Sequence, residues 1–154
     1  MNLLHNNTLG IDIGSTTVKI AVLDSEQHIL FTDYERHYAN IQETLALLLS
    51  KAKEKLGEMT VSPSITGSGG LTLSGHLNVP FTQEVVAVAT ALQDYAPQTD
   101  VAIELGGEDA KIIYFTGGID QRMNGICAGG TGSFIDQMAS LLQTDAAGLN
   151  KYAK

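Results

Sequence analysis

The stretch LGIDIGSTTVK, residues 9–19, organises the interpretation of the whole chain. An apolar, β-branched run leads to the acid Asp12, and a second such run, residues 18–23, contains Lys19. Between them lie one glycine and three small hydroxyl residues: Gly14, Ser15, Thr16 and Thr17. Two apolar runs separated by a short glycine turn predict a β-hairpin whose turn exposes backbone amides and hydroxyls.

Such a turn can bind a phosphate group, because small residues let the backbone approach and unpaired N–H groups favour negative charge. The Asp12 carboxylate would then lie where a phosphate-bound Mg²⁺ needs an oxygen ligand. Lys19 would neutralise phosphate charge, although a lysine at the start of a strand could equally point to solvent. The alternative interpretation is an ordinary sheet turn with an incidental acid.

Composition describes a globular α/β protein of 154 residues, with 44% hydrophobic and 17% charged residues. A net charge of −8 argues against a nucleic-acid partner or an anionic membrane surface. No apolar run approaches the roughly 20 residues that cross a bilayer. The one cysteine, Cys127, excludes an intrachain disulfide and fits a reducing compartment. We therefore expect a cytoplasmic protein without a membrane segment.

After the hairpin, the pattern predicts a strand over residues 28–37, a helix from a capping box at Asn40 and Glu43, and a strand over residues 61–66. Thr82 then caps a helix that ends before Pro97. The four histidines have no metal-ligand spacing, and we interpret them as surface or edge residues: His5, His28, His37 and His76.

The pattern of residues 10–23, GIDIGSTTVKIAVL, returns as AIELGGEDAKIIYF at residues 102–115. A shift of 92 positions aligns three pairs: Asp12 with Glu104, Gly14 with Gly106, and Lys19 with Lys111. A strand near residues 119–123 and a helix over residues 131–142 continue the match. This internal duplication predicts two related domains, residues 1–97 and 98–154.

The second copy is shorter than the first by a strand and a helix. We therefore expect the chain to be a fragment, with a complete first domain and a truncated second one. A naturally shortened second half, closed by its last helix, is the alternative.

Two such hairpins can hold a polyphosphate from opposite sides. The second turn would bring backbone amides and carboxylates to the terminal phosphate and its metal: Gly106, Gly107, Glu108 and Asp109. The chain has no Walker A ending and no Rossmann glycine pattern, which disfavours those nucleotide-binding classes. Asp12 is the candidate magnesium ligand, and either Glu108 or Glu84 could orient the attacking water.

Residues 12–17, 83–92 and 104–111 resemble the phosphate motifs and connecting helix of the actin, Hsp70 and sugar-kinase superfamily. The run NGICAGGTGSFIDQMA, residues 124–139, is more specific. It resembles the ATPase activators of 2-hydroxyacyl-CoA dehydratases and the ATPase subunits of benzoyl-CoA reductase.

The resemblance implies a ribonuclease-H-like fold in each domain, a mixed sheet flanked by helices. It implies a homodimer that binds ATP with Mg²⁺ and shares one [4Fe-4S] cluster, from which ATP hydrolysis drives an electron into an acyl-CoA dehydratase or reductase. Cys127 matches a cluster ligand, beside a helix start that would stabilise a thiolate. In the family, the second ligand cysteine and the adenosine loop lie beyond the position of Lys154. We therefore expect neither an intact cluster nor tight ATP binding from these residues alone.

Two other functions stay open. A small-molecule, sugar-type kinase of the same superfamily would need a catalytic Asp after the fourth strand, and residues 67–77 contain none. A non-catalytic, nucleotide-dependent interaction module would not need Cys127 in its glycine-rich setting.

Overall fold

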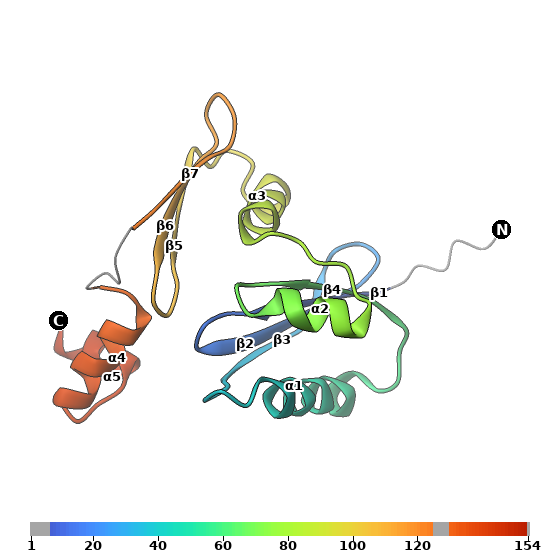
Figure 1. Ribbon diagram of the computed structural model, residues 1–154, viewed down its shortest axis with the longest axis horizontal. Coiled ribbons are helices and arrows are strands. Elements are labelled where there is room, and N and C mark those ends of the chain that lie inside the picture. Colours follow the sequence, from blue (N-terminus) through green and yellow to red (C-terminus); the bar gives the residue numbers. More distant parts are fainter. Residues whose placement is uncertain (1–6, 125–129, 154) are drawn as a thin grey trace. The chain divides into compact units, whose positions relative to one another are not determined.

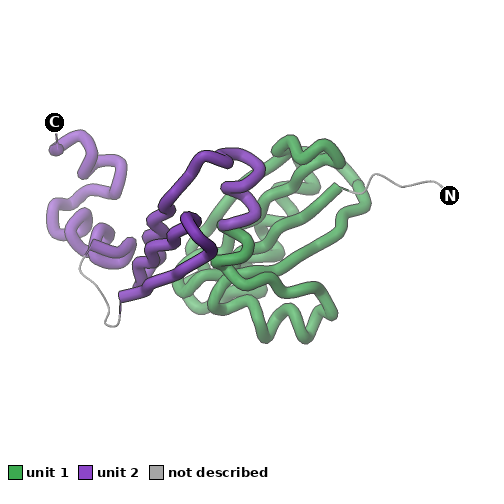
Figure 2. The backbone as a smooth tube through the Cα atoms, turned by 90° about the horizontal axis from the view of Figure 1, so that it is seen from above, with its two compact units in different colours: residues 1–88 green, residues 89–154 purple. Residues whose placement is uncertain are grey.

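The structure is a computed structural model that describes residues 7–124 and 130–153. It divides into two compact units, residues 1–88 and 89–154 (Figure 2). Helix α3, Glu84–Tyr95, runs across this division. The domain boundary expected after residue 97 therefore stays a prediction.

The first unit is built on a four-stranded sheet in the order β3-β2-β1-β4. Strands β1 (Asn7–Ile13), β2 (Thr17–Leu23) and β3 (Ile29–Arg36) form an antiparallel meander, because short turns join them. Strand β4 (Val61–Thr66) runs parallel to β1 after a helical crossover. The sheet is therefore mixed, as the sequence predicts.

Alternating apolar residues of β1 and β2 place one face of this sheet in a core. Helix α1, Ile41–Leu56, covers that face (Figure 1), and its Leu48 is fully buried. Lys51 on α1 also binds Asp33 and Glu35 of β3, with Nζ–O distances of 3.0 and 2.6 Å. The buried apolar residues of the unit form one cluster: Leu9, Ile11, Ile13, Val18, Ile20, Val22, Phe31, Leu45, Leu48, Ala52 and Ile65.

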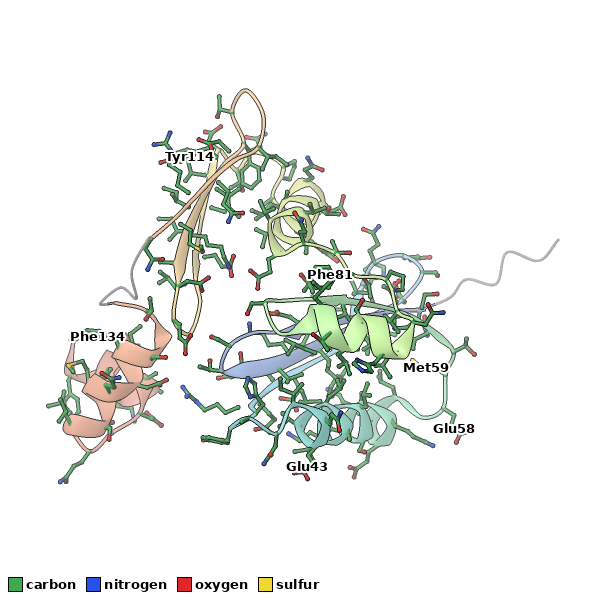
Figure 3. All side chains as sticks on the ribbon, viewed as in Figure 1. Glu43, Glu58, Met59, Phe81, Tyr114 and Phe134 are labelled. Carbon is green, nitrogen blue, oxygen red and sulfur yellow. The ribbon has the colours of Figure 1, made fainter. Side chains whose placement is uncertain are left out.

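The capping box predicted for α1 is wrong. Asn40 precedes the helix, but its side chain makes no cap hydrogen bond, and Glu43 lies on the exposed side of α1 (Figure 3). The Asn40 backbone is not in the extended conformation from which a cap side chain reaches the next amides. Instead its N–H donates to the His37 carbonyl, 2.6 Å away.

Helix α2, Gly70–Leu77, was not predicted, because its sequence GLTLSGHL has no clear apolar period. Residues 80–82 then return beside β4, where Ile65 and Phe81 form a parallel bridge. The Ile65 amide donates to the Pro80 carbonyl at 2.9 Å, and the Thr82 amide donates to the Ile65 carbonyl at 2.8 Å. The chain thus enters α3 from a position next to β4.

The second unit contains an antiparallel three-stranded sheet, β5 (Val101–Leu105), β6 (Ala110–Tyr114) and β7 (Asp120–Met123). Helices α4 (Gly132–Leu141) and α5 (Ala146–Tyr152) follow and pack on each other (Figure 1). Among the helices in residues 7–124 and 130–153, none has both the length and the apolar character needed to span a lipid bilayer.

Candidate nucleotide site

Turn 1, residues 14–17, joins β1 to β2. The Gly14 amide donates to the Thr17 carbonyl at 2.9 Å, which closes the turn. Ser15 is exposed at its tip, and Thr16 and Thr17 are partly exposed. The small polar residues that the sequence singles out therefore lie at an accessible edge of the first sheet.

Asp12 and Lys19 lie opposite each other on β1 and β2. The Lys19 Nζ donates to Asp12 Oδ2 at 2.7 Å, and both side chains are partly exposed. An ion pair this exposed contributes at most about 1 kcal/mol of stability. The pair is therefore weak enough for either side chain to exchange it for another partner.

The loop of residues 67–70 packs against the end of β1. Gly67 has φ +96°, and a side chain there would lie 2.6 Å from Asp12 Oδ1 and closer still to the Ile13 carbonyl. The Gly69 amide donates to that carbonyl at 2.9 Å. The sequence indicates a loop that closes the strand over residues 61–66, but it does not indicate the contact of this loop with Asp12. No local pattern around Gly67 indicates this contact, because its partners lie at the end of β1, far earlier in the sequence.

The prediction that His37 is a surface or edge residue is wrong. Its side chain is 8% exposed, and its Nε2 lies 3.2 Å from the Gly14 carbonyl oxygen. The His37 backbone N–H donates to the Thr16 carbonyl at 3.1 Å. His37 therefore contacts turn 1 twice, from the end of β3. By contrast, His28 and His76 are exposed, as expected.

Glu84 is the first residue of α3. Asp12 of β1 pairs with Thr66 of β4 in a parallel register. The neighbouring residue of β4, Ile65, forms a parallel bridge with Phe81, so residues 80–82 lie on the other side of β4. Since these three segments run in the same direction, the chain leading to Glu84 leaves the sheet at the same edge as Asp12. Two strand spacings, roughly 10 Å, separate β1 from this segment.

Turn 2, residues 106–109, joins β5 to β6 in the second unit. The Gly106 amide donates to the Asp109 carbonyl at 2.9 Å, the same closure as in turn 1. Glu104 and Lys111 are opposite each other, as Asp12 and Lys19 are in the first hairpin. The duplication seen in the sequence is thus reproduced in strand register and in turn hydrogen bonding.

Lys111 differs from Lys19 in its surroundings. It is buried, and its Nζ lies 3.2 Å from both Glu104 Oε1 and Asp109 Oδ2. The second Glu104 oxygen is also buried, and it has no hydrogen-bond partner among the described residues. Lys111 is thus shared by two carboxylates, Glu104 of β5 and Asp109 of turn 2, and these three side chains together carry a net negative formal charge.

The start of α4 binds turn 2. The Gly132 amide donates to the Gly106 carbonyl at 2.9 Å, and the Ser133 amide donates to the Gly107 carbonyl at 2.8 Å. On the other flank, the Asn124 side-chain oxygen accepts from the Ala110 amide at 2.7 Å. The candidate iron–sulfur ligand Cys127 lies outside the described residues. Within the described residues, no three His, Cys, Asp or Glu side chains gather as a metal site.

The first unit brings one set of predicted residues to a single sheet edge: Asp12, Gly14, Ser15, Thr16, Thr17 and Lys19. The second unit gathers the other set around turn 2: Gly106, Gly107, Glu108 and Asp109. A duplicated hairpin with an acid and a glycine turn, on a mixed sheet with flanking helices, defines an actin-type, ribonuclease-H-like ATPase fold.

The chain belongs to the BadF/BadG/BcrA/BcrD ATPase family, whose model matches residues 9–150. It is 29% identical over 147 residues to the (R)-2-hydroxyglutaryl-CoA dehydratase activating ATPase of Acidaminococcus fermentans, covering 92% of this chain and 56% of that protein. It is 32% identical over 144 residues to the activator of lactoyl-CoA dehydratase of Anaerotignum propionicum, covering 89% and 54%.

Solved structures agree with this assignment. Component A of the (R)-2-hydroxyglutaryl-CoA dehydratase from Acidaminococcus fermentans superposes with a TM-score of 0.75 at 28% identity, covering 95% of this chain and 57% of that one. The activator of 2-hydroxyisocaproyl-CoA dehydratase from Clostridium difficile, solved with bound ADPNP, gives 0.71 at 27% identity, covering 91% and 53%. The chain thus spans little more than half the length of these relatives.

Proposed function

We propose that the chain is part of an ATP-hydrolysing activator of an acyl-CoA dehydratase or a related acyl-CoA reductase. The observation that carries the proposal is the pair of hairpins in one register, each with an acid–lysine pair and a glycine turn closed by the same hydrogen bond. The names of its relatives, which are activators of 2-hydroxyacyl-CoA dehydratases, support the choice of partner.

In the proposed mechanism, turn 1 binds the β- and γ-phosphates of ATP. Backbone amides and the three hydroxyls of residues 15–17 replace the water around the phosphate oxygens. Lys19 exchanges part of its contact with Asp12 for the phosphates, because its ion pair is exposed and weak. Mg²⁺, when bound, would neutralise phosphate charge, and Asp12 would hold it through its carboxylate.

Turn 2 is proposed to act on the terminal phosphate. Gly106 and Gly107 let the backbone approach, and Asp109 is placed beside them. Lys111 forms ion pairs with Glu104 and Asp109. Its charge therefore stabilises the turn and does not contact the nucleotide. We assign Lys111 to the support of the turn.

Two carboxylates remain candidates for orienting the attacking water. Glu84 leaves the sheet at the same edge as Asp12, and Glu108 lies in turn 2. The residue that orients water affects the chemical step more than binding, since it acts on the attacking nucleophile. Glu84→Gln and Glu108→Gln therefore separate the two, because only one should lower kcat strongly while leaving the Kd for Mg-ATP near the wild-type value.

The finer proposal, electron delivery from a [4Fe-4S] cluster, does not fit these 154 residues alone. Such a cluster needs four thiolate ligands, whereas the chain has one cysteine, Cys127. Two copies of the chain in a homodimer would supply two. We therefore propose Cys127 as one ligand of a cluster shared by a homodimer of the full-length protein, and we derive no step through that cluster.

The proposal is tested by measuring Mg-ATP binding and hydrolysis in the full-length protein, with and without Asp12→Ala. Loss of Mg-ATP affinity in the variant supports the site, because the magnesium ligand is removed while the fold keeps its core. Unchanged affinity would contradict the role of Asp12. Transfer of the γ-phosphoryl group from ATP to a sugar hydroxyl would favour the kinase alternative instead.

The activator role has its own test, made without oxygen. The full-length protein with ATP should switch on turnover of an acyl-CoA dehydratase or reductase, and its Cys127→Ser variant should bind ATP but fail to activate the partner. If the Cys127→Ser variant still activates the partner enzyme, the proposed role of Cys127 as a cluster ligand is wrong.

A further inference from the structure

His37 follows β3 and is buried against turn 1. Its ring makes two contacts: Nε2 lies 3.2 Å from the Gly14 carbonyl oxygen, and Nδ1 lies 3.1 Å from the Ala39 amide nitrogen. The sequence offers no metal-ligand or catalytic pattern that would explain a histidine here. Its role must therefore come from the two backbone groups that its ring contacts.

The partners of the ring fix its protonation state. The Ala39 amide can only donate, so Nδ1 accepts and carries no proton. The Gly14 carbonyl can only accept, so Nε2 carries the proton and donates to it. His37 in this geometry is therefore the neutral imidazole with its hydrogen on Nε2.

The segment that places this ring is strained. Tyr38 and Ala39 have φ values of 44° and 69°, in the left-handed region that residues with a Cβ rarely adopt. Such strain persists only where surrounding contacts hold it, and it is frequent at functional sites. Here the contacts are the Nδ1 bond to Ala39 and the 2.6 Å bond from the Asn40 amide to the His37 carbonyl.

His37 orients two peptide groups of turn 1. In a trans peptide the carbonyl and the following amide point in opposite directions. Because Nε2 holds the Gly14 carbonyl, the Ser15 N–H points away from the imidazole. Because the His37 N–H holds the Thr16 carbonyl, the Thr17 N–H is turned in the same way.

In turn 2, the carbonyl of the first glycine is also held by a hydrogen bond, but the donor is a backbone amide. The shift of 92 positions carries Gly14 onto Gly106, and the Gly106 carbonyl accepts from the Gly132 amide. In both repeats, the carbonyl of the first turn glycine is held by the chain that returns after the third strand. An imidazole N–H in the first repeat thus takes the place of a backbone N–H in the second.

We propose that His37 is a positioning residue for the nucleotide phosphates. It holds the Gly14 and Thr16 carbonyls on one side of turn 1, so that the Ser15 and Thr17 amides face the phosphate side. This inference rests on the proposed function, because it assigns His37 to phosphate binding at the same turn.

Three substitutions separate this role from a purely local one. The side-chain amide of His37→Gln is long enough to place an N–H donor where Nε2 lies, within hydrogen-bonding distance of the Gly14 carbonyl. His37→Asn is too short for that, but its side-chain oxygen can accept from the Ala39 amide in an Asx turn. His37→Ala loses both contacts. The glutamine and asparagine variants therefore form a matched pair.

The test measures the Kd for Mg-ATP and for adenosine in the full-length protein. One lost hydrogen bond predicts about fivefold weaker Mg-ATP binding for His37→Ala and His37→Asn. His37→Gln should stay within about twofold of wild type, since it retains the donor. Adenosine affinity should be unchanged in all three, because only the phosphate turn is affected.

Wild-type Mg-ATP affinity in His37→Asn would overturn the inference. So would equal losses in the asparagine and glutamine variants, or an equal loss for adenosine. If the wild-type protein binds no Mg-ATP, the proposed function fails separately. Hydrogen exchange of the Gly14 amide then tests only whether His37 orders turn 1. Exchange should rise in His37→Ala and His37→Asn but not in His37→Gln, and equal exchange in all variants would refute the inference.

Discussion

Strands β1 and β5 occupy the same place in the two repeats, but their side chains have opposite environments. Leu9, Ile11 and Ile13 of β1 are 7%, 4% and 0% exposed, whereas Val101, Ile103 and Leu105 of β5 are 42%, 70% and 60% exposed. Within the described residues, β1 pairs with a strand on each side and its apolar side chains share a buried cluster with Leu48 of α1, whereas β5 pairs with β6 alone. A hairpin pattern thus sets turn and register locally, and burial depends on what packs against it.

The largest expected effect uses this pair of strands directly. Ile11→Ala should lower the free energy of unfolding by about 2–5 kcal/mol, because it empties a buried site in the core. Ile103→Ala, the same change at the matching position, should cost less than about 0.5 kcal/mol. Urea unfolding followed by circular dichroism measures both. Similar losses at the two positions would mean that β5 is buried in solution.

A second comparison concerns two glycines with positive φ. Gly67→Ala should cost about 2–4 kcal/mol, since the new methyl group meets the end of β1 in addition to the backbone strain. Gly57 also has positive φ, but no atom lies within 4 Å of a side chain placed there. Gly57→Ala should therefore cost less, about 1–2 kcal/mol, all of it from backbone strain. Equal losses in thermal unfolding would show that the approach of Gly67 to Asp12 has no energetic importance.

The two turns differ in a third, smaller way. A side chain at Gly106 would clash with the Asp109 carboxylate, whereas one at Gly14 would make ordinary contacts with Thr17. Gly106→Ala should thus displace Asp109 from Lys111 and cost about 1 kcal/mol. Gly14→Ala should cost less than about 0.5 kcal/mol. Unfolding free energies test the order, and a more damaging Gly14→Ala would reverse our view of which turn is tighter.

The smallest effect concerns Lys51, whose place in the second repeat is taken by Gln143. The hydrogen bond from Lys51 lowers the pKa of Asp33 below 3.8, and bonds to Glu35 and then Asp33 raise the pKa of Lys51 above 10.5. A lowered acid pKa stabilises the fold above pH 3.8 and loses this effect as the pH falls further. A raised lysine pKa stabilises it below pH 10.5 and loses the effect as the pH rises further.

Lys51→Met should therefore destabilise the protein slightly at neutral pH. The difference from wild type should shrink below pH 3.8 and above pH 10.5, as read from melting temperatures across the pH range. A difference that does not change with pH would show that Lys51 acts through packing of its aliphatic stem and not through charge.

Both hairpins could be predicted from sequence, because alternation, a glycine turn and an acid–lysine pair are local signals. Helix α2 could not, since its start depends on Gly70 packing against Ile65 and Phe81 from distant parts of the chain. The capping box at Asn40 failed for a related reason, because the strained residues before it set a backbone that the cap side chain cannot use.

The candidate site divides in the same way. The residues of turn 1 and turn 2 were identified by residue type and spacing, which the duplication made specific. His37 and Gly67 were missed, because each acts on a partner far away in the sequence, His37 on Gly14 and Gly67 on Asp12. Nothing in their immediate neighbours marks those contacts.

The bonds around turn 2 have a mechanical consequence. Asn124 is tied to Ala110 at one end of the turn, and Gly132 and Ser133 are tied to Gly106 and Gly107 at the other. Asn124 on one side and Gly132 and Ser133 on the other are therefore hydrogen-bonded to the same hairpin. A change in the conformation of turn 2 therefore alters hydrogen bonds to both of these parts of the chain.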